Sequence, residues 1–138
     1  MIQLEPYLLW ICNAGDCRDA TKVLEAGIRA VVQLAIEEPP TQFPRDVIVV
    51  RIPLLDGSDN SLDTLRLAVT TLQHLLTTKV PTLLCCSAGM SRSPAVAACA
   101  LARINGRAPT ESLAQIQSRL GTDISPRLWQ DLLACFFA

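Results

Sequence analysis

The fold is decided by the stretch Val80-Pro-Thr-Leu-Leu-Cys-Cys86-Ser-Ala-Gly-Met-Ser91, which runs straight into Arg92-Ser-Pro-Ala-Val-Ala-Ala-Cys-Ala-Leu-Ala-Arg-Ile-Asn105. The residues from Val80 to Cys86 are mostly apolar, and this segment is the one that most resembles a buried strand. The small-residue segment from Arg92 to Asn105 predicts a helix that closes at Gly106. A buried strand that passes through a short glycine-containing turn into a helix is a building unit of α/β domains.

Further strands are predicted on the N-terminal side of this unit. Tyr7 to Cys12 reads as a first strand, and the β-branched runs Arg29 to Ala35 and Val47 to Ile52 read as two more. Because these last two runs are continuously apolar, we expect both strands to be covered on both faces. Between them the segment from Glu37 to Pro44 holds three prolines, which exclude regular structure and predict a loop.

Helices are predicted between and after these strands. One spans Asp16 to Ala26 and stops at Gly27; its expected buried residues are Ala20, Val23 and Leu24. A second begins near Ser61, and its expected buried stripe consists of Leu62, Leu65, Val69, Leu72 and Leu76. Two more helices begin at Thr110 as a cap and at Ser125 with Pro126 in the first turn. The alternation predicts an α/β fold: a single domain with a central, mostly parallel sheet flanked by helices.

Composition narrows the class of protein. The chain has 138 residues, 50% hydrophobic and 18% charged, which suits one domain over residues 1–138 with a continuous core. Twelve Lys and Arg stand against thirteen Asp and Glu, so no broad basic field is available for nucleic acid. No apolar run reaches the roughly 18 residues needed to span a bilayer, and we expect no membrane partner.

Six cysteines are spread along the chain at positions 12, 17, 85, 86, 99 and 135. Small disulfide scaffolds are poor in apolar core, whereas this chain is rich in it. Cys12 and Cys17 lack a second Cys/His pair that would complete a zinc site, and the only histidine, His74, lies in a leucine-rich stretch. We therefore expect mostly free thiols, no metal, and a reducing, cytoplasmic setting.

The segment from Cys86 to Ser93 predicts an anion-binding loop. Backbone N–H groups of Ser87, Ala88, Gly89, Met90 and Ser91 would point inward at a strand-to-helix turn, where the helix N-terminus adds positive potential. Arg92 supplies a planar fork that can pair with two phosphate oxygens at once. The same positive groups favour the thiolate form of Cys86, which then becomes a nucleophile for a bound phosphate.

Asp56 is the expected proton donor for the leaving oxygen. It follows a predicted strand, and the loops at the carboxyl ends of parallel strands meet at the edge that carries Cys86. Asp56 would protonate the leaving group and then deprotonate the hydrolytic water. Asp59 is the alternative acid, because Asp56 also suits an ordinary surface turn. Ser93 either donates a hydrogen bond to the departing sulfur or serves only as a helix-cap residue.

These residues resemble a known family. Cys86-x5-Arg92-Ser93 is similar to the signature of the cysteine-based protein tyrosine phosphatase superfamily, and the remaining chain looks like the small dual-specificity phosphatases. Similar segments are Pro6 to Trp10, Asn13 to Asp19 and Gly27 to Leu34, and Asp56 precedes Cys86 by 86 − 56 = 30 residues, near the family's general acid. The resemblance implies a cofactor-free, metal-independent phosphatase, which we expect to be monomeric, acting on proteins phosphorylated at tyrosine and at serine or threonine.

One position departs from the family pattern. A histidine usually precedes the nucleophile, whereas this chain has Cys85. We expect a Cys86 thiol that ionises less readily than is usual in the family, with Cys85 facing away from the pocket because side chains alternate along a strand. Two other functions remain open: a catalytically weak domain that holds phosphorylated partners, and sulfur transfer or arsenate reduction by the thiolate loop.

Overall fold

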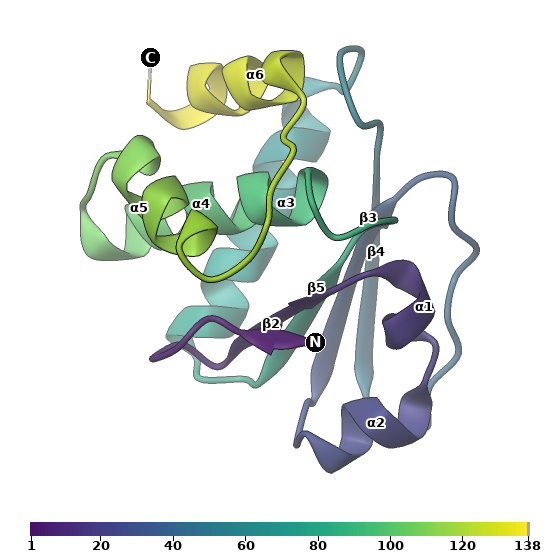
Figure 1. The fold of residues 1–138 in the computed structure, drawn as a ribbon. Helices are drawn as coiled ribbons and strands as arrows, with labels where there is room; N and C mark the ends of the chain where they lie inside the picture. Colours follow the sequence, from purple (N-terminus) through teal and green to yellow (C-terminus); the bar gives the residue numbers. More distant parts are fainter. Residues whose placement is uncertain (138) are drawn as a thin grey trace.

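A computed structural model describes residues 1–137 and shows an α/β fold built on one five-stranded sheet (Figure 1). The strand order is β1-β2-β5-β3-β4, and the pairs β2–β5, β5–β3 and β3–β4 are parallel, whereas β1 pairs antiparallel with β2. The strand bounds are β1 Ile2–Gln3, β2 Leu9–Cys12, β3 Ala30–Ala35, β4 Ile48–Leu54 and β5 Thr82–Cys85. The predicted fold class, a mostly parallel central sheet flanked by helices, is confirmed.

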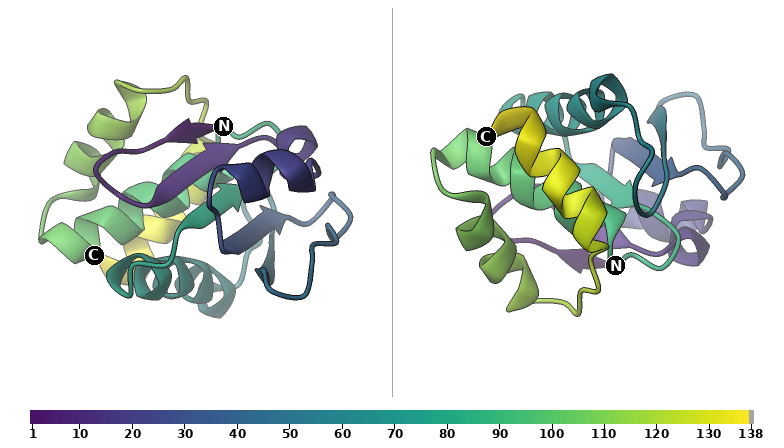
Figure 2. Two further views of the ribbon diagram at one scale, coloured as in Figure 1. Left: turned by 90° about the horizontal axis from the view of Figure 1, so that it is seen from below. Right: turned by 90° about the horizontal axis from the view of Figure 1, so that it is seen from above.

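Six helices flank the sheet within the described residues: α1 Ala14–Cys17, α2 Ala20–Glu25, α3 Leu62–Thr77, α4 Arg92–Asn105, α5 Pro109–Gln117 and α6 Pro126–Phe136. Figure 2 shows α1 and α2 on one side of the sheet and α3 to α6 on the other. Successive side chains of the central strands point to opposite faces of the sheet and belong to two apolar clusters. Val32 and Leu84 face the α3 and α4 side, whereas Val31 and Leu83 face the α2 side. None of the helices described within residues 1–137 has the length and apolarity of a membrane span.

The helix predicted over Asp16 to Ala26 is wrong as a single element, because the chain forms two short helices there. Asp19 is the N-cap of α2, where its side chain accepts a hydrogen bond from the Lys22 N–H, and this cap starts a new helix. Val23 is buried as expected, whereas Leu24 is exposed. The predicted stop at Gly27 is confirmed, since this residue has the left-handed φ of +81°.

The prediction of two fully covered strands holds for β3 only. All six residues of β3 are buried, but β4 lies at the edge of the sheet and exposes Ile48 and Val49. Pro53 fits an edge position, because proline cannot donate to a ladder of hydrogen bonds. Apolar composition alone did not distinguish an edge strand from a central one.

Helix starts were predicted with mixed success. Ser61 caps α3 as expected by accepting from the Thr64 N–H, although Leu62 lies outside the buried stripe. The cap predicted at Thr110 is wrong, since Ala108 is the N-cap of α5 and Pro109 takes the first turn. Ser125 occupies the N-cap position of α6, but its side chain makes no capping hydrogen bond.

Candidate active site

The turn between β5 and α4 holds the residues of the predicted anion-binding loop. Cys86 directly follows β5, and Arg92 is the first residue of α4. Gly89 has φ +77°, and a Cβ built there would come within 3.0 Å of the Cys12 carbonyl oxygen. This close approach arises because Cys12 and Cys85 are register partners, so the end of β2 lies beside the loop. The Ala14 N–H donates to the backbone carbonyl oxygen of Ser87 at 2.9 Å and fixes the loop further.

A pocket of about 320 Å³ opens over this loop. Four segments that are distant in sequence form it: the β5–α4 turn and the segments that follow β3, β4 and α5. The first three follow the carboxyl ends of parallel strands, the edge at which α/β proteins bind ligands. The lining residues are Glu37, Asp56, Cys86, Ser87, Ala88, Met90, Ser91, Arg92 and Asp123.

Most of the residues predicted to act together meet in this pocket. Cys86 and Arg92 line it although each is only 3% exposed. Asp56 lines it as well, whereas its rival Asp59 does not and instead takes a positive φ in the loop. Gly89 and Ser93 are not lining residues. Ser93 lies in the first turn of α4, fully buried, and its Oγ has no hydrogen-bond partner in the described chain.

The guanidinium of Arg92 is held from one side. Nη1 and Nη2 donate to the two carboxylate oxygens of Glu37, each at 2.6 Å, and Nη1 also donates to the Leu54 carbonyl at 2.9 Å. The hydrogen bonds from Arg92 lower the pKa of Glu37 to about 2. Arg92 Nε is buried and has no partner within residues 1–137. The Nε edge is therefore the part of the fork that is free to meet an anion.

Asp56 is connected to the loop through Ser91. The Ser91 Oγ donates to Asp56 Oδ1 at 2.5 Å and accepts from the Ser125 N–H at 3.0 Å. The Asp56 turn is itself closed by Asn60, whose Oδ1 accepts from the Leu55 N–H at 2.8 Å and whose Nδ2 donates to the Leu55 carbonyl at 2.9 Å. These hydrogen bonds hold Asp56 over the pocket.

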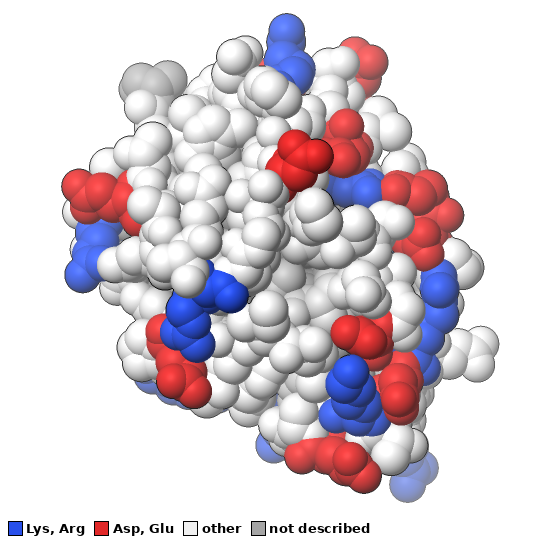
Figure 3. Space-filling model, viewed as in Figure 1, with Lys and Arg blue, Asp and Glu red and all other residues white. Residues whose placement is uncertain are grey.

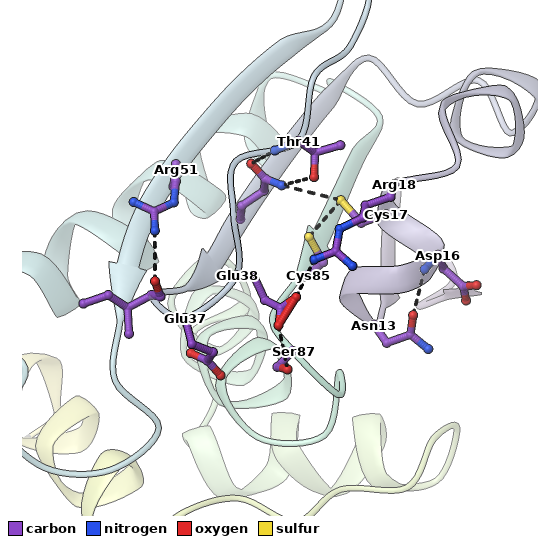
Figure 4. A network of polar contacts seen from close by, with 12 residues as sticks. Asn13, Asp16, Cys17, Arg18, Glu37, Glu38, Thr41, Arg51, Cys85 and Ser87 are labelled. Atoms are coloured by element: carbon purple, nitrogen blue, oxygen red, sulfur yellow. Dashed lines mark hydrogen bonds and ion pairs between the residues drawn. The ribbon is translucent and has the colours of Figure 1, made fainter.

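Cys85 lies on the opposite face of the sheet from the pocket, as side-chain alternation predicts. Its sulfur is 3.1 Å from the Cys17 sulfur and both residues are buried (Figure 4). Hydrogen bonding to the Cys12 and Cys17 thiols, together with burial, raises the pKa of Cys85. The residue that replaces the usual histidine therefore belongs to a thiol cluster under the sheet, formed by Cys12, Cys17 and Cys85.

Three residues of the site were missed by sequence reasoning: Glu37, Ser91 as a side-chain donor, and Asp123. Glu37 and its neighbour Glu38 follow Ile36, the first residue after β3, and the rule that placed Asp56 after β4 would also have placed them at this edge. Glu38 accepts from Ser87 Oγ at 3.3 Å and pairs with Arg18, so it braces the loop from outside (Figure 4). Asp123 had no sequence signal, because its position depends on how the α5–α6 connection folds.

Comparison with known structures gives the same fold. Human DUSP28 has a TM-score of 0.85 at 21% identity, over 98% of this chain and 94% of that one. A mouse putative dual specificity phosphatase, complexed with zinc tungstate, has a TM-score of 0.84 at 23% identity, over 97% and 84% of the two chains. The human tyrosine phosphatase-like serine/threonine/tyrosine-interacting protein has a TM-score of 0.81 at 17% identity, over 97% and 93%. None of the curated protein sequences compared with the chain matches it.

A family model matches the sequence itself. The family is described as "Polymorphic toxin system, DSP-PTPase phosphatase", and the match covers residues 12–106. That range runs from the last residue of β2 to the end of α4 and includes Glu37, Asp56 and the whole segment from Cys86 to Ser93. The chain therefore belongs to the DSP-PTPase phosphatase family of polymorphic toxin systems, within the dual-specificity branch of the cysteine-based phosphatases.

Proposed function

We propose that the chain hydrolyses phosphomonoesters through a phosphocysteine intermediate on Cys86. The observation that carries this proposal is the meeting of Cys86 and Arg92, from the β5–α4 turn, with Asp56, from the loop after β4, in one pocket. A chance gathering of a thiol, a buried guanidinium and a carboxyl group over a helix N-terminus is improbable, and phosphoryl transfer through cysteine needs each of the three.

The phosphate is bound by the β5–α4 turn. The phosphate oxygens accept hydrogen bonds from the loop N–H groups of residues 87–91 and from Arg92 Nε, which has no partner within the described chain. Burial strengthens these hydrogen bonds, because water does not compete for the donors. The α4 N-terminus contributes further positive potential where charge develops on the phosphoryl oxygens.

The reaction takes two steps. The Cys86 thiolate attacks phosphorus, the S–P bond forms, and the ester P–O bond breaks as Asp56 gives its proton to the leaving oxygen. Asp56 then takes a proton from water, whose oxygen attacks phosphorus while the S–P bond breaks and the thiolate returns. Ser93 Oγ, buried and without a partner in the described residues, is the proposed hydrogen-bond donor to the departing sulfur. A positioned general acid such as Asp56 contributes about 10²–10⁴-fold to the rate.

We propose phosphorylated proteins as substrates, with phosphotyrosine and phosphoserine or phosphothreonine both accepted. A pocket of about 320 Å³ formed by short loops suits several phosphorylated side chains. All the groups invoked come from one chain, so a monomer suffices. All six cysteines are free thiols, and Cys86 acts only when reduced, which supports a reducing compartment such as the cytoplasm.

Turnover of p-nitrophenyl phosphate tests the proposal. Cys86→Ser is expected to abolish turnover while inorganic phosphate still binds. Asp56→Asn is expected to lose more rate on poor leaving groups than on good ones, because only poor leaving groups need the proton. An Asp56→Asn variant with unchanged rates on both would show that Asp56 is not the acid and would reopen sulfur transfer or arsenate reduction, which do not require one, as the reaction of the thiolate loop.

A second candidate is a domain that holds phosphorylated partners with little turnover. The observation that favours it is the occupied Nη edge of Arg92, where Glu37 already takes both donors. Vanadate binding to the wild-type chain without turnover of p-nitrophenyl phosphate would select this function over the hydrolase.

A further inference from the structure

The mouth of the pocket is acidic. Of its lining residues, Glu37, Asp56 and Asp123 carry carboxyl groups, and Arg92 is the one basic side chain among them. These carboxyl groups come from three separate connections, after β3, after β4 and between α5 and α6. Figure 3 shows acidic side chains gathered on the upper right of this face, over the loops that follow β3 and β4 and beside the start of α6.

The three carboxyl groups differ in how their charge is balanced. Glu37 pairs with Arg92, and Asp56 accepts from Ser91. Asp123 is exposed, and within residues 1–137 its carboxylate makes no ion pair or hydrogen bond. Its backbone N–H donates to the Met90 carbonyl at 2.8 Å, which fixes the residue against the loop. An unbalanced negative charge is thus held at the rim of a pocket that binds an anion.

The floor of the pocket carries the opposite charge to the rim, because Arg92 lies there. The buried Nε of Arg92 has no partner within the described chain, so the floor is made for one phosphate group. A second anionic group on the substrate finds no further basic side chain in the lining and meets the Asp123 carboxylate at the rim. A cationic group beside the phosphorylated residue meets Asp123 instead.

We infer that the site selects phosphorylated residues flanked by lysine or arginine and discriminates against substrates with further negative charge. The inference rests on the proposed phosphatase function and adds a substrate class to it. Because the rim is open to water, one charge pair changes kcat/KM by a few-fold, and attraction and repulsion together give about three- to tenfold between arginine- and glutamate-flanked substrates. Salt screens an exposed pair, so high ionic strength narrows the difference.

Three phosphotyrosine peptides that differ only in the flanking residues, arginine, alanine or glutamate, test the inference. At low salt we expect the highest kcat/KM for the arginine peptide, an intermediate value for alanine and the lowest for glutamate. In 0.5 M NaCl these differences in kcat/KM should become smaller. Asp123→Asn is expected to reduce the arginine-to-glutamate ratio. The matched control is Asp46→Asn, which removes the same charge from an exposed position before β4, at the opposite end of the strands, and is expected to leave the ratio as it is.

Equal kcat/KM values for the three peptides, or a preference for glutamate, would overturn the inference while leaving the phosphatase intact. Hydrolysis of neither the peptides nor p-nitrophenyl phosphate would overturn the proposed function. In that case the dissociation constants of the three peptides on Cys86→Ser decide the selectivity separately: the same order supports an acidic rim that selects basic partners, and equal constants reject it.

Discussion

At the scale of single residues, Glu37 determines which edge of Arg92 is left free for the proposed phosphate. It takes Nη1 and Nη2, each at 2.6 Å, and so leaves the buried Nε edge for the ligand. Glu37→Gln keeps the shape but replaces one acceptor oxygen with a donor, which breaks the two-point pairing. We expect KM for p-nitrophenyl phosphate and Ki for inorganic phosphate to rise about three- to tenfold in Glu37→Gln. A fall in both constants would show instead that Glu37 competes with the phosphate.

The same ion pair predicts a pH dependence of stability. Folding lowers the pKa of Glu37 from its ordinary 4.5 to about 2, so the pair stabilises the fold fully above pH 4.5 and progressively less as pH falls towards 2. The Glu37 side chain is 49% exposed, and solvent screening limits the contribution to about 1 kcal/mol. Urea unfolding of wild type and Glu37→Gln should differ by that amount at pH 7 and converge near pH 2. A difference independent of pH would contradict the prediction.

Ser91 is the residue expected to position the general acid. Its hydroxyl donates to Asp56 Oδ1 and accepts from the Ser125 N–H, so Ser91→Ala frees Asp56 from the loop. A hydrogen bond worth about 1 kcal/mol corresponds to a three- to tenfold loss of kcat on phenyl phosphate, with a smaller loss on p-nitrophenyl phosphate. The matched control is Ser58→Ala, because Ser58 lies in the turn that holds Asp56 but its hydroxyl donates to Asp59 instead. Equal losses on both substrates would assign Ser91 a structural role only.

Sequence reasoning at this scale identified the residues to which we assign the chemistry, but not the residues that hold them in place. Cys86, Arg92 and Asp56 stand in a spacing with chemical meaning, so a motif identifies them. Glu37 and Asp123 act through their place in space, and Asp123 reaches the pocket only because its backbone bonds to Met90 across the α5–α6 connection. No local pattern encodes such a contact.

At the scale of elements, the β5–α4 turn depends on Gly89. Gly89→Ala combines an unfavourable φ of +77° with a Cβ only 3.0 Å from the Cys12 carbonyl oxygen, a backbone atom that cannot move aside cheaply. We expect this variant to lose phosphate binding and most turnover. Gly106→Ala is the matched control, since it has φ +62° with nothing within 4 Å, and it should cost about 1 kcal/mol of stability while activity is kept. Similar activity in the two variants would reject a close-packed turn.

Helices and strands were predictable where residues near their ends determine their bounds, and less so where the packing of other elements determines their exposure. The bounds of α4 follow from a turn before it and a glycine after it, and Ser61 marks α3 through its own side chain. The exposure of β4 depends on the strand order, since an apolar run reads the same at the centre and at the edge of a sheet. The break between α1 and α2 depends on Asp19 acting as a cap instead of as an interior helix residue.

At the scale of the whole molecule, the sheet separates the thiols into two environments. Cys12, Cys17 and Cys85 lie in the cluster on the α2 side, and Cys99 lies within the larger core on the α4 side, each 5% exposed or less. Burial raises the pKa of Cys99 to about 12, which leaves it unreactive at neutral pH. Cys86 is equally buried by area but lines an open pocket, and Cys135 is partly exposed.

This arrangement predicts the pattern of thiol alkylation. Iodoacetamide should modify native protein at Cys86 and Cys135, whereas Cys17 and Cys99, both fully buried, should react only after global unfolding, because reaching them requires opening the folded core. Inorganic phosphate should protect Cys86 and leave Cys135 unaffected, with sodium chloride of equal ionic strength as the control; peptide mass spectrometry measures both. Phosphate-independent labelling of Cys86 would place the anion elsewhere. Labelling of Cys17 as fast as Cys135 would mean that the thiol cluster beneath the loop opens locally, and a phosphate-binding loop on such a support could not keep its N–H groups aimed at one point.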